Sequence, residues 1–388
     1  MSRYPHLSYS MRDVRRAGEI ITGDLIWKPE TENEIRSAFS IANNWRDSHA
    51  YPMRSIRFSL LIHIRNQKLA GFSAARLKRM QAIRRKLRKM QARGKPLNLN
   101  QLQDLGGCRA IMRTMDDVNR LVEGFKEKSK HEFRGENNYI ISPKDDGYRS
   151  HHLKYAFRGT GELERHNGRR IEIQVRTMLQ HSWATAIEAV GLFRGEDLKG
   201  SDGSTEWLRL FQLMSAEFAE AEGCLPPPGM PSREARVQEL KGLSDHLDAL
   251  NALESLSHAT QWDLEAIRPR DKPTHYLIKY NRDSRRVEVL PYYRPVFAVA
   301  AYDDAENSAR TFDSQASNIV LVEVDKIDNL KMSYPNYFGD VQTFRKNLSL
   351  AVTGKSIEEY AITPQAVATP RPVERIDPSW LRSRGRWT

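Results

Sequence analysis

The stretch SHHLKYAFRGTGELERHNGRRIEIQVRT, residues 150–177, decides the fold. Its two ends, 150–157 and 169–177, carry β-branched and aromatic residues in partial alternation with polar ones, a pattern typical of β-strands. The polar turn between them joins the two strands. Two neighbouring runs have the same texture, NYIISP at 138–143 and the glycine-led GGCRAIM at 106–112. We therefore expect a β-sheet that contains these strands.

Amphipathic patterns predict helices around this sheet. Residues 73–95 contain ten lysines and arginines, no acid and one apolar stripe, which predicts a single basic amphipathic helix. Further helices are expected at 31–70, 116–130, 178–193, 207–223 and 232–264. A sheet with such neighbours is typical of an α+β fold, a mixed β-sheet flanked by helices.

The chain changes character after the break RPRDKP near residue 270. Four runs alternate like antiparallel strands, so residues 273 to about 330 are expected to form a small all-β unit. These runs are 275–281, 285–293, 295–304 and 317–327, and a short helix is expected at 341–352. We divide the chain into an N-terminal extension at 1–30, a main domain at 31–225, a helical linker at 226–272, a β-rich domain at 273–354 and a proline- and arginine-rich tail at 355–388.

Charge and cysteine content narrow the class of protein. Lysine and arginine number 61 against 49 aspartates and glutamates, a net charge of +12 that attracts phosphate-rich partners. Cys108 and Cys224 are the only cysteines, too few for a disulfide framework or a four-cysteine zinc site. No run approaches the roughly 20 apolar residues that span a membrane. We therefore expect a cytoplasmic protein without a membrane partner.

Two acids stand among cations. Asp104 precedes the strand at 106–112, and Glu172 lies inside the strand at 169–177 with arginines on both sides. A carboxylate in such company has a depressed pKa and stays ionised, which suits a metal ligand or a base for a hydroxyl nucleophile. The alternative is that Glu172 only pairs with Arg170 on a sheet face. The cations that could gather around a triphosphate here are Arg76, Lys78, Lys86, Arg109, Lys144 and Arg176.

Four motifs in order carry a family resemblance. They are RLKRMQAIRRKL, DLGGCRAI, YIISPKDDGYRSHH and IEIQVRTMLQHSWA. Together they resemble the synthetase domain of RelA/SpoT-type alarmone synthetases over roughly residues 31–225, whereas no glycine-rich P-loop motif occurs. The resemblance implies a pyrophosphokinase, in which a hydroxyl attacks the β-phosphate of ATP and AMP is released. Because no His-Asp dipeptide occurs, we expect synthesis without the family's hydrolase activity.

The resemblance also assigns roles to residues. It implies that Asp104 and Glu172 lie at the metal, where Asp104 holds Mg²⁺ and Glu172 either orients the metal or acts as the base that activates the hydroxyl. It also implies that Tyr148 stacks on the acceptor base. The ATP-binding set would be Arg76, Lys78, Lys86, Arg109, Lys144, His152, Gln174 and Arg176. The chain departs from the family pattern on the acceptor side, with Asn137 and Asn138 in place of a lysine and an aspartate.

The acceptor remains open between two classes of molecule. One is the 3′-terminal adenosine of tRNA, which toxic small synthetases modify, and the other is GDP or GTP, which yields the alarmone. The basic helix favours RNA because cations beyond the ATP set remain on it, namely Arg79, Arg84, Arg85, Arg88 and Lys89. The alternative is that these side chains are only a solvated helix face.

The order of the segments resembles the CapRel type of fused toxin and antitoxin in phage defence. That likeness implies a C-terminal pseudo-zinc-finger whose Tyr334 and Tyr337 cover the ATP site until a phage capsid protein releases them. The alternative for the two tyrosines is packing inside the β-rich domain. We expect a monomer. A catalytically dead nucleotide- or RNA-binding module is the third hypothesis, against which the presence of both acids argues.

Overall fold

The computed structural model describes residues 4–26, 28–194, 196, 198, 203–259, 261–264, 273–281, 286–311, 317–324, 330 and 341–357. The helices are α1 (Met11–Thr22), α2 (Pro29–Asp47), α3 (Ala50–Asn66), α4 (Met80–Ala92), α5 (Met115–Lys128), α6 (Met178–Arg194), α7 (Thr205–Ala221), α8 (Arg233–His246), α9 (Ala249–Ala259), α10 (Pro295–Thr311) and α12 (Gln342–Ala351). The strands are β1 (Gly71–Leu77), β2 (Gly106–Met112), β3 (Glu132–Asn138), β4 (His151–Ala156), β5 (Arg170–Thr177), β6 (Gln261–Leu264), β7 (His275–Asn281), β8 (Arg286–Tyr292) and β9 (Ser317–Glu323). Short 3₁₀ turns, η1 (Leu99–Gln101) and η2 (Gly161–His166), connect some of them.

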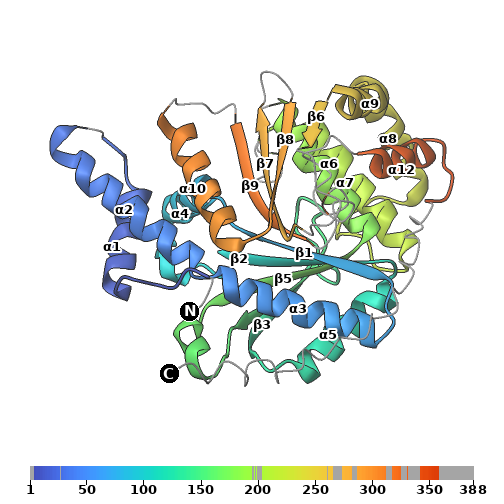
Figure 1. The fold of residues 1–388 in the computed structure, drawn as a ribbon. Helices are drawn as coiled ribbons and strands as arrows, with labels where there is room; N and C mark the ends of the chain where they lie inside the picture. The colour runs from blue at the N-terminus through green and yellow to red at the C-terminus, as the bar shows by residue number, and fades with distance from the viewer. Residues whose placement is uncertain are drawn as a thin grey trace, which may run out of the picture.

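These strands form one sheet in the order β3-β4-β5-β2-β1-β9-β7-β8-β6. The pairs β2·β5 and β6·β8 are parallel, and the other neighbours are antiparallel. The predicted α+β class with a mixed sheet is therefore confirmed. The five strands β1 to β5 form one half of this sheet, and the four later strands extend it (Figure 1).

Alternation along β5 separates an apolar face from a polar one. Ile171, Ile173 and Val175 are fully buried in a cluster with side chains of α3 and α5. Because successive strand residues point to opposite faces, Glu172 and Gln174 lie on the other face. Figure 1 shows α3 and α5 on one side of β1 to β5 and the C-terminal strands on the other.

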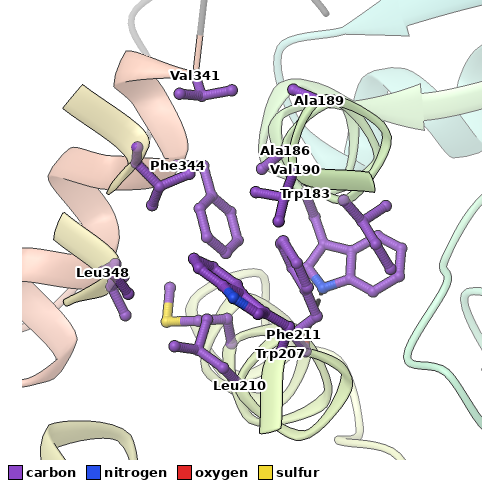
Figure 2. Close-up of a cluster of buried hydrophobic side chains, with 14 of the residues drawn as sticks. Trp183, Ala186, Ala189, Val190, Trp207, Leu210, Phe211, Val341, Phe344 and Leu348 are labelled. Carbon is purple, nitrogen blue, oxygen red and sulfur yellow. Dashed lines mark hydrogen bonds between the residues drawn. The ribbon is translucent and has the colours of Figure 1, made fainter. Parts of the chain in front are cut away.

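A second core lies among helices from both ends of the sequence. Phe344 of α12 is fully buried, and its ring centroid lies 5.2 Å from that of Phe211 on α7. Figure 2 shows Phe344 beside Trp207 and Phe211, with Trp183 beyond Phe211, so α12 completes the core that α6 and α7 begin. The last described helix is therefore part of the packing of the main domain.

Two elements of the main domain differ from the prediction. Residues 73–95 do not form a single helix, because β1 takes the first five and pairs with β2 from Gly71↔Met112 to Leu77↔Gly106. The run at 138–143 is not a strand either. There the Oδ1 oxygen of Asn138 accepts hydrogen bonds from two later backbone amides and turns the chain, so β3 lies earlier.

The helical prediction at 232–264 also needs correction. The stretch divides into α8 and α9 at Asp248, which adopts φ +47°, and its end forms strand β6. A left-handed residue interrupts a helix because its carbonyl and amide leave the helical ladder.

The predicted all-β unit is wrong at 295–304. This run lies in α10, where Ala298, Val299 and Tyr302 recur at helical spacing and pack against Leu277 and Leu321 of the C-terminal strands. The C-terminal strands also continue the sheet of the main domain, because β9 pairs with β1 through Ala75↔Glu323 and Arg76↔Val322.

Buried charges join the C-terminal part to the main domain. Arg46 at the end of α2 is fully buried, contacts the carboxyl groups of Asp47 and Asp303, and lies over the ring of Tyr302 at 4.7 Å. Arg57 of α3 contacts Glu323 of β9 at 3.4 Å, with both side chains 4% exposed. Ion pairs this buried stabilise a fixed arrangement only while both partners remain.

Candidate active site

Strand register gathers the predicted residues on the face opposite α3. Glu172 lies between Gly107 of β2 and Lys154 of β4, and Gly107 lies opposite Arg76 of β1. Two residues further along, Gln174 lies between Arg109 and His152. Arg176 follows on the same face of β5.

Asp104 enters this site from the turn between η1 and β2. Its Oδ2 oxygen contacts Lys78 Nζ at 2.7 Å and Lys86 Nζ at 2.9 Å. The Lys78 amide donates to the carbonyl of Leu105 at 2.8 Å, which holds the two chain segments together. Burial opposes ionisation of Asp104, but the two ammonium groups prevail and lower its pKa to about 2. The carboxylate is therefore ionised at neutral pH.

Glu172 is held by its neighbours on β4 and β5. Its Oε1 oxygen accepts a hydrogen bond from Gln174 Nε2 at 2.9 Å and lies 3.4 Å from His152 Nδ1. The other nitrogen of His152 is 2.9 Å from the hydroxyl of Tyr148. Burial acts to raise the pKa of Glu172, yet its contacts with His152 and Gln174 lower it below the ordinary value.

The two acids lie within electrostatic reach of each other. The charge of Asp104 acts on Glu172 and raises its pKa against the effect of His152. The hydroxyl of Tyr139 is subject to charges of the same site: burial and then Glu172 raise its pKa, and Lys86, a partner of Asp104, lowers it. The Tyr139 ring packs edge-on against His152 at 5.1 Å. One polar centre therefore contains both carboxylates.

The donor set suits Mg²⁺. In the part of the chain that the structure describes, the Oδ1 oxygen of Asp104 is buried and has no hydrogen-bond partner. An ionised carboxylate oxygen in that position is a ligand that Mg²⁺ prefers, and this metal often takes only one or two carboxylates together with phosphates and water. Asp104 and Glu172 would hold it.

Lys144 lies over the ring of Tyr148, the ring that was expected to stack on the acceptor base. Lys144 Nζ sits 4.9 Å from the centre of the Tyr148 ring and 4.6 Å from that of Tyr139. The Tyr148 side chain is 5% exposed and packs against Trp183 at 6.3 Å. A base that stacks on Tyr148 would have to take the place of Lys144. The ring of Tyr139 is only half-buried and is therefore more accessible than that of Tyr148.

The remaining cations fall into two groups. Arg109 and Arg176 are buried, and Arg176 donates to His181. On α4, Arg84 donates to the carbonyl of Ile21 at 2.7 Å and Arg88 pairs with Asp24 at 2.6 Å. A surface hollow of about 500 Å³ lies on α4. It is lined by Gln81, Ala92 and four of the predicted RNA-binding residues, namely Arg84, Arg85, Arg88 and Lys89. Arg79 precedes the helix as its N-cap.

Two residues of the site escaped the sequence analysis. Tyr139 was assigned to a strand, and Lys154 was only one polar position in the run HHLKYA. Lys154 could have been found from alternation, because it shares a strand face with His152. Tyr334 and Tyr337 lie outside the described residues.

Residues 75–195 match the family model described as "Region found in RelA / SpoT proteins". This part of the chain is similar to a RelA/SpoT-type domain. GTP pyrophosphokinase YjbM of Bacillus subtilis (strain 168) is 29% identical over 118 residues, which are 29% of this chain and 53% of the relative. The chain thus spans about half the length of that curated relative.

The chain is also similar to solved structures. Small alarmone synthetase 1 of Bacillus subtilis, bound to its product pppGpp, matches with a TM-score of 0.37 and 20% identity over 45% of this chain and 88% of that one. A GTP pyrophosphokinase family protein from Streptococcus pneumoniae matches with a TM-score of 0.38 and 20% identity over 51% and 91%. Among the helices of the described residues, none has the length and apolar character of a membrane span.

Proposed function

We propose that this protein transfers pyrophosphate from ATP to a hydroxyl group of an acceptor and releases AMP. The observation that carries the proposal is Asp104, which is ionised between Lys78 and Lys86 and shares a polar centre with Glu172. Phosphoryl-type transfer needs positioning and charge neutralisation more than covalent help, and this centre offers both.

The residues have separate tasks in this reaction. The phosphates of ATP would replace Asp104 as partners of Lys78 and Lys86, with Arg76, Arg109 and Arg176 nearby on the same sheet face. Bound Mg²⁺ would neutralise phosphate charge beside the freed Asp104. Glu172 would accept the proton of the acceptor hydroxyl while the oxygen of that hydroxyl forms a bond to the β-phosphorus. The bond from that phosphorus to the oxygen of the α-phosphate breaks, and AMP leaves.

We propose the 3′-terminal adenosine of tRNA as the acceptor. The net charge of +12 and the cation-lined hollow on α4 support a polynucleotide partner. Arg85 and Lys89 of that hollow are exposed, whereas Arg84 and Arg88 also hold the segment around α1. The second candidate is GDP or GTP, because the similar protein YjbM is a GTP pyrophosphokinase.

A label-transfer assay tests these proposals on the full chain carrying Tyr334→Ala, the change expected to relieve the inhibition proposed below. ATP labelled in its terminal phosphates would be incubated with bulk tRNA, GDP or GTP, and the product separated by size. We expect label in tRNA, and label in a guanosine nucleotide alone would establish the second candidate. Asp104→Asn and Glu172→Gln should abolish transfer. If the Tyr334→Ala chain labels nothing while it still binds ATP, the protein is a binding module and the proposed activity is refuted.

We further propose that the C-terminal part, a pseudo-zinc-finger of the CapRel type, inhibits a toxic synthetase until a phage capsid protein binds it. The direct pairing of β9 with β1, beside Arg76, supports a link between the two parts. In the full chain, Tyr334→Ala should make expression toxic without phage, and Tyr293→Ala, an exposed tyrosine, should not. A well-folded Tyr334→Ala protein that stays harmless would contradict the proposed inhibition by the C-terminal part.

A further inference from the structure

Lys154 occupies a position beside Glu172 that the proposed ATP site leaves unused. On β4 it lies directly across from Glu172 of β5, on the face that carries His152. Its Nζ donates a hydrogen bond to Asn137 Oδ1 at 2.6 Å, and within the described part of the chain it forms no ion pair. A half-buried ammonium group that only an amide oxygen holds is available to a phosphate.

The strip beyond Lys154 is open and leads to the edge of the sheet. On its other side Lys154 faces Gly135 of β3, the edge strand. Gly135 adopts φ +121°, and among the described residues an added Cβ atom would meet nothing within 4 Å, so no side chain of that part of the chain covers this place. The register shift next to it marks a bulge, a common device at sheet edges.

Cations continue along this edge. Two residues further along β4, about 7 Å away, Ala156 faces Glu132, which holds both Arg134 at 2.7 Å and Arg158 at 2.5 Å. The two guanidinium groups are 47% and 55% exposed and share a single carboxylate. The strip of Lys154, Gly135, Arg134 and Arg158 is thus positively charged from the catalytic centre to solvent.

We propose that this strip binds the phosphodiester backbone of a single-stranded RNA 3′ end. The inference rests on the proposed function, because the terminal hydroxyl is placed at Glu172. Lys154 then binds the phosphate of the terminal nucleotide, and Arg134 and Arg158 bind the next phosphates. A mononucleotide such as GDP has no backbone to reach the two arginines, so the strip selects polynucleotide acceptors.

Binding measurements on the full chain test this proposal without relying on activity. The probe is a short single-stranded RNA with a 5′ fluorophore and a free 3′ hydroxyl, followed by anisotropy at several salt concentrations. Lys154→Ala should weaken binding about tenfold, the loss of one charge-assisted contact. It should also lower the slope of log affinity against log salt by about 0.7, the value for one phosphate of a single strand. Lys154→Arg should restore most of the affinity, and Arg158→Ala should weaken RNA binding but leave GDP binding unchanged.

Lys279→Ala is the matched control, because Lys279 is also a half-exposed lysine within a strand. Equal RNA affinity of the Lys154→Ala and Lys279→Ala proteins, or a wild-type chain that binds no RNA, would overturn the inference. An equal loss of RNA and GDP binding in Arg158→Ala would also overturn it. If label transfer fails for every acceptor while the strip variants lose RNA binding, the proposed reaction fails and the strip stands. If transfer occurs and the strip variants bind RNA normally, only the strip is refuted.

Discussion

Arg46 and Asp303 lie 257 residues apart in the chain and form an ion pair in which the arginine side chain is fully buried. The pair joins the end of α2 to α10, and Asp47 completes it from the side of α2. A guanidinium group in this position depends on its acids because water cannot replace them. The contact therefore couples the C-terminal part to the stability of the main domain.

Removal of one partner should be costly. We expect Asp303→Ala to lower the free energy of unfolding by about 3 kcal/mol, because it leaves the buried charge of Arg46 with Asp47 alone. Urea denaturation measures the change. Asp304→Ala is a suitable comparison at the next position of the same helix. Equal stability of the two variants would show that the ion pair contributes little.

Asp47 should make stability depend on pH. Burial, helped by the charge of Asp303 and opposed by Arg46, raises the pKa of Asp47 from 3.8 to about 8. Between these values the folded protein keeps a proton that the unfolded chain releases, so stability should fall as the pH rises from about 4 to 8. Asp47→Asn should flatten this part of the curve in thermal melts, whereas exposed Asp116→Asn should not. An unchanged slope in Asp47→Asn would contradict the assignment.

Helix α12 should be required for the core of the main domain. Phe344→Ala removes a fully buried ring from the cluster in Figure 2 and should cost about 3–5 kcal/mol of unfolding free energy. Phe297→Ala removes a ring that is 59% exposed and should change stability by less than about 0.5 kcal/mol. Chemical denaturation compares the two variants, and similar midpoints would mean that α12 packs only loosely.

His152 should determine the pH at which the acid limb of the pH–rate profile begins, through its effect on the pKa of Glu172. Because its contacts lower the pKa of Glu172, His152→Ala should raise that pKa, and the carboxylate should lose its charge at a higher pH. The rate of label transfer should then begin to fall at a higher pH than in the wild type, while Glu172→Gln should lose the rate at every pH. An acid limb that stays in place in His152→Ala would assign it to another group.

Lys78 and Lys86 should act as one unit. Both ammonium groups contact the same oxygen of Asp104, so either substitution to alanine should weaken ATP binding about tenfold. The double variant should lose less than the sum of the two effects, since each change alters the same carboxylate. Calorimetric titration with ATP and Mg²⁺ tests this, and strict additivity would mean that the two lysines bind separate phosphates.

The local pattern of apolar and polar residues was sufficient to predict much of the fold and part of the candidate site. The strands β4 and β5 and the helices α6 and α7 follow from alternation and helical periodicity within one short segment each. Asp104 and Glu172 were expected to lie together at a metal, and the charge of Asp104 does act on Glu172, while their roles stay predictions. Their residue type among cations was the decisive signal, because a carboxylate of that kind rarely serves only packing.

Other features depend on partners far away in the sequence. The run PVFAVAAYDD suits a strand by composition, but α10 begins at its proline and turns Ala298 and Tyr302 toward the C-terminal strands. Residues 71–77 become a strand because β2 and β9 pair with them on both sides. The place of Lys154 beside Glu172 follows from register, which no single segment encodes.

The seam between β1 and β9 determines what a shortened chain would become. Without the residues after 272, the outer main-chain groups of β1 at Ala75 and Arg76 lose their partners, and the strand turns into an open edge. Open edges invite pairing with other molecules, and such a fragment is prone to aggregate. A precipitating fragment would then report on the loss of a neighbouring strand and say nothing about the release of an inhibited enzyme.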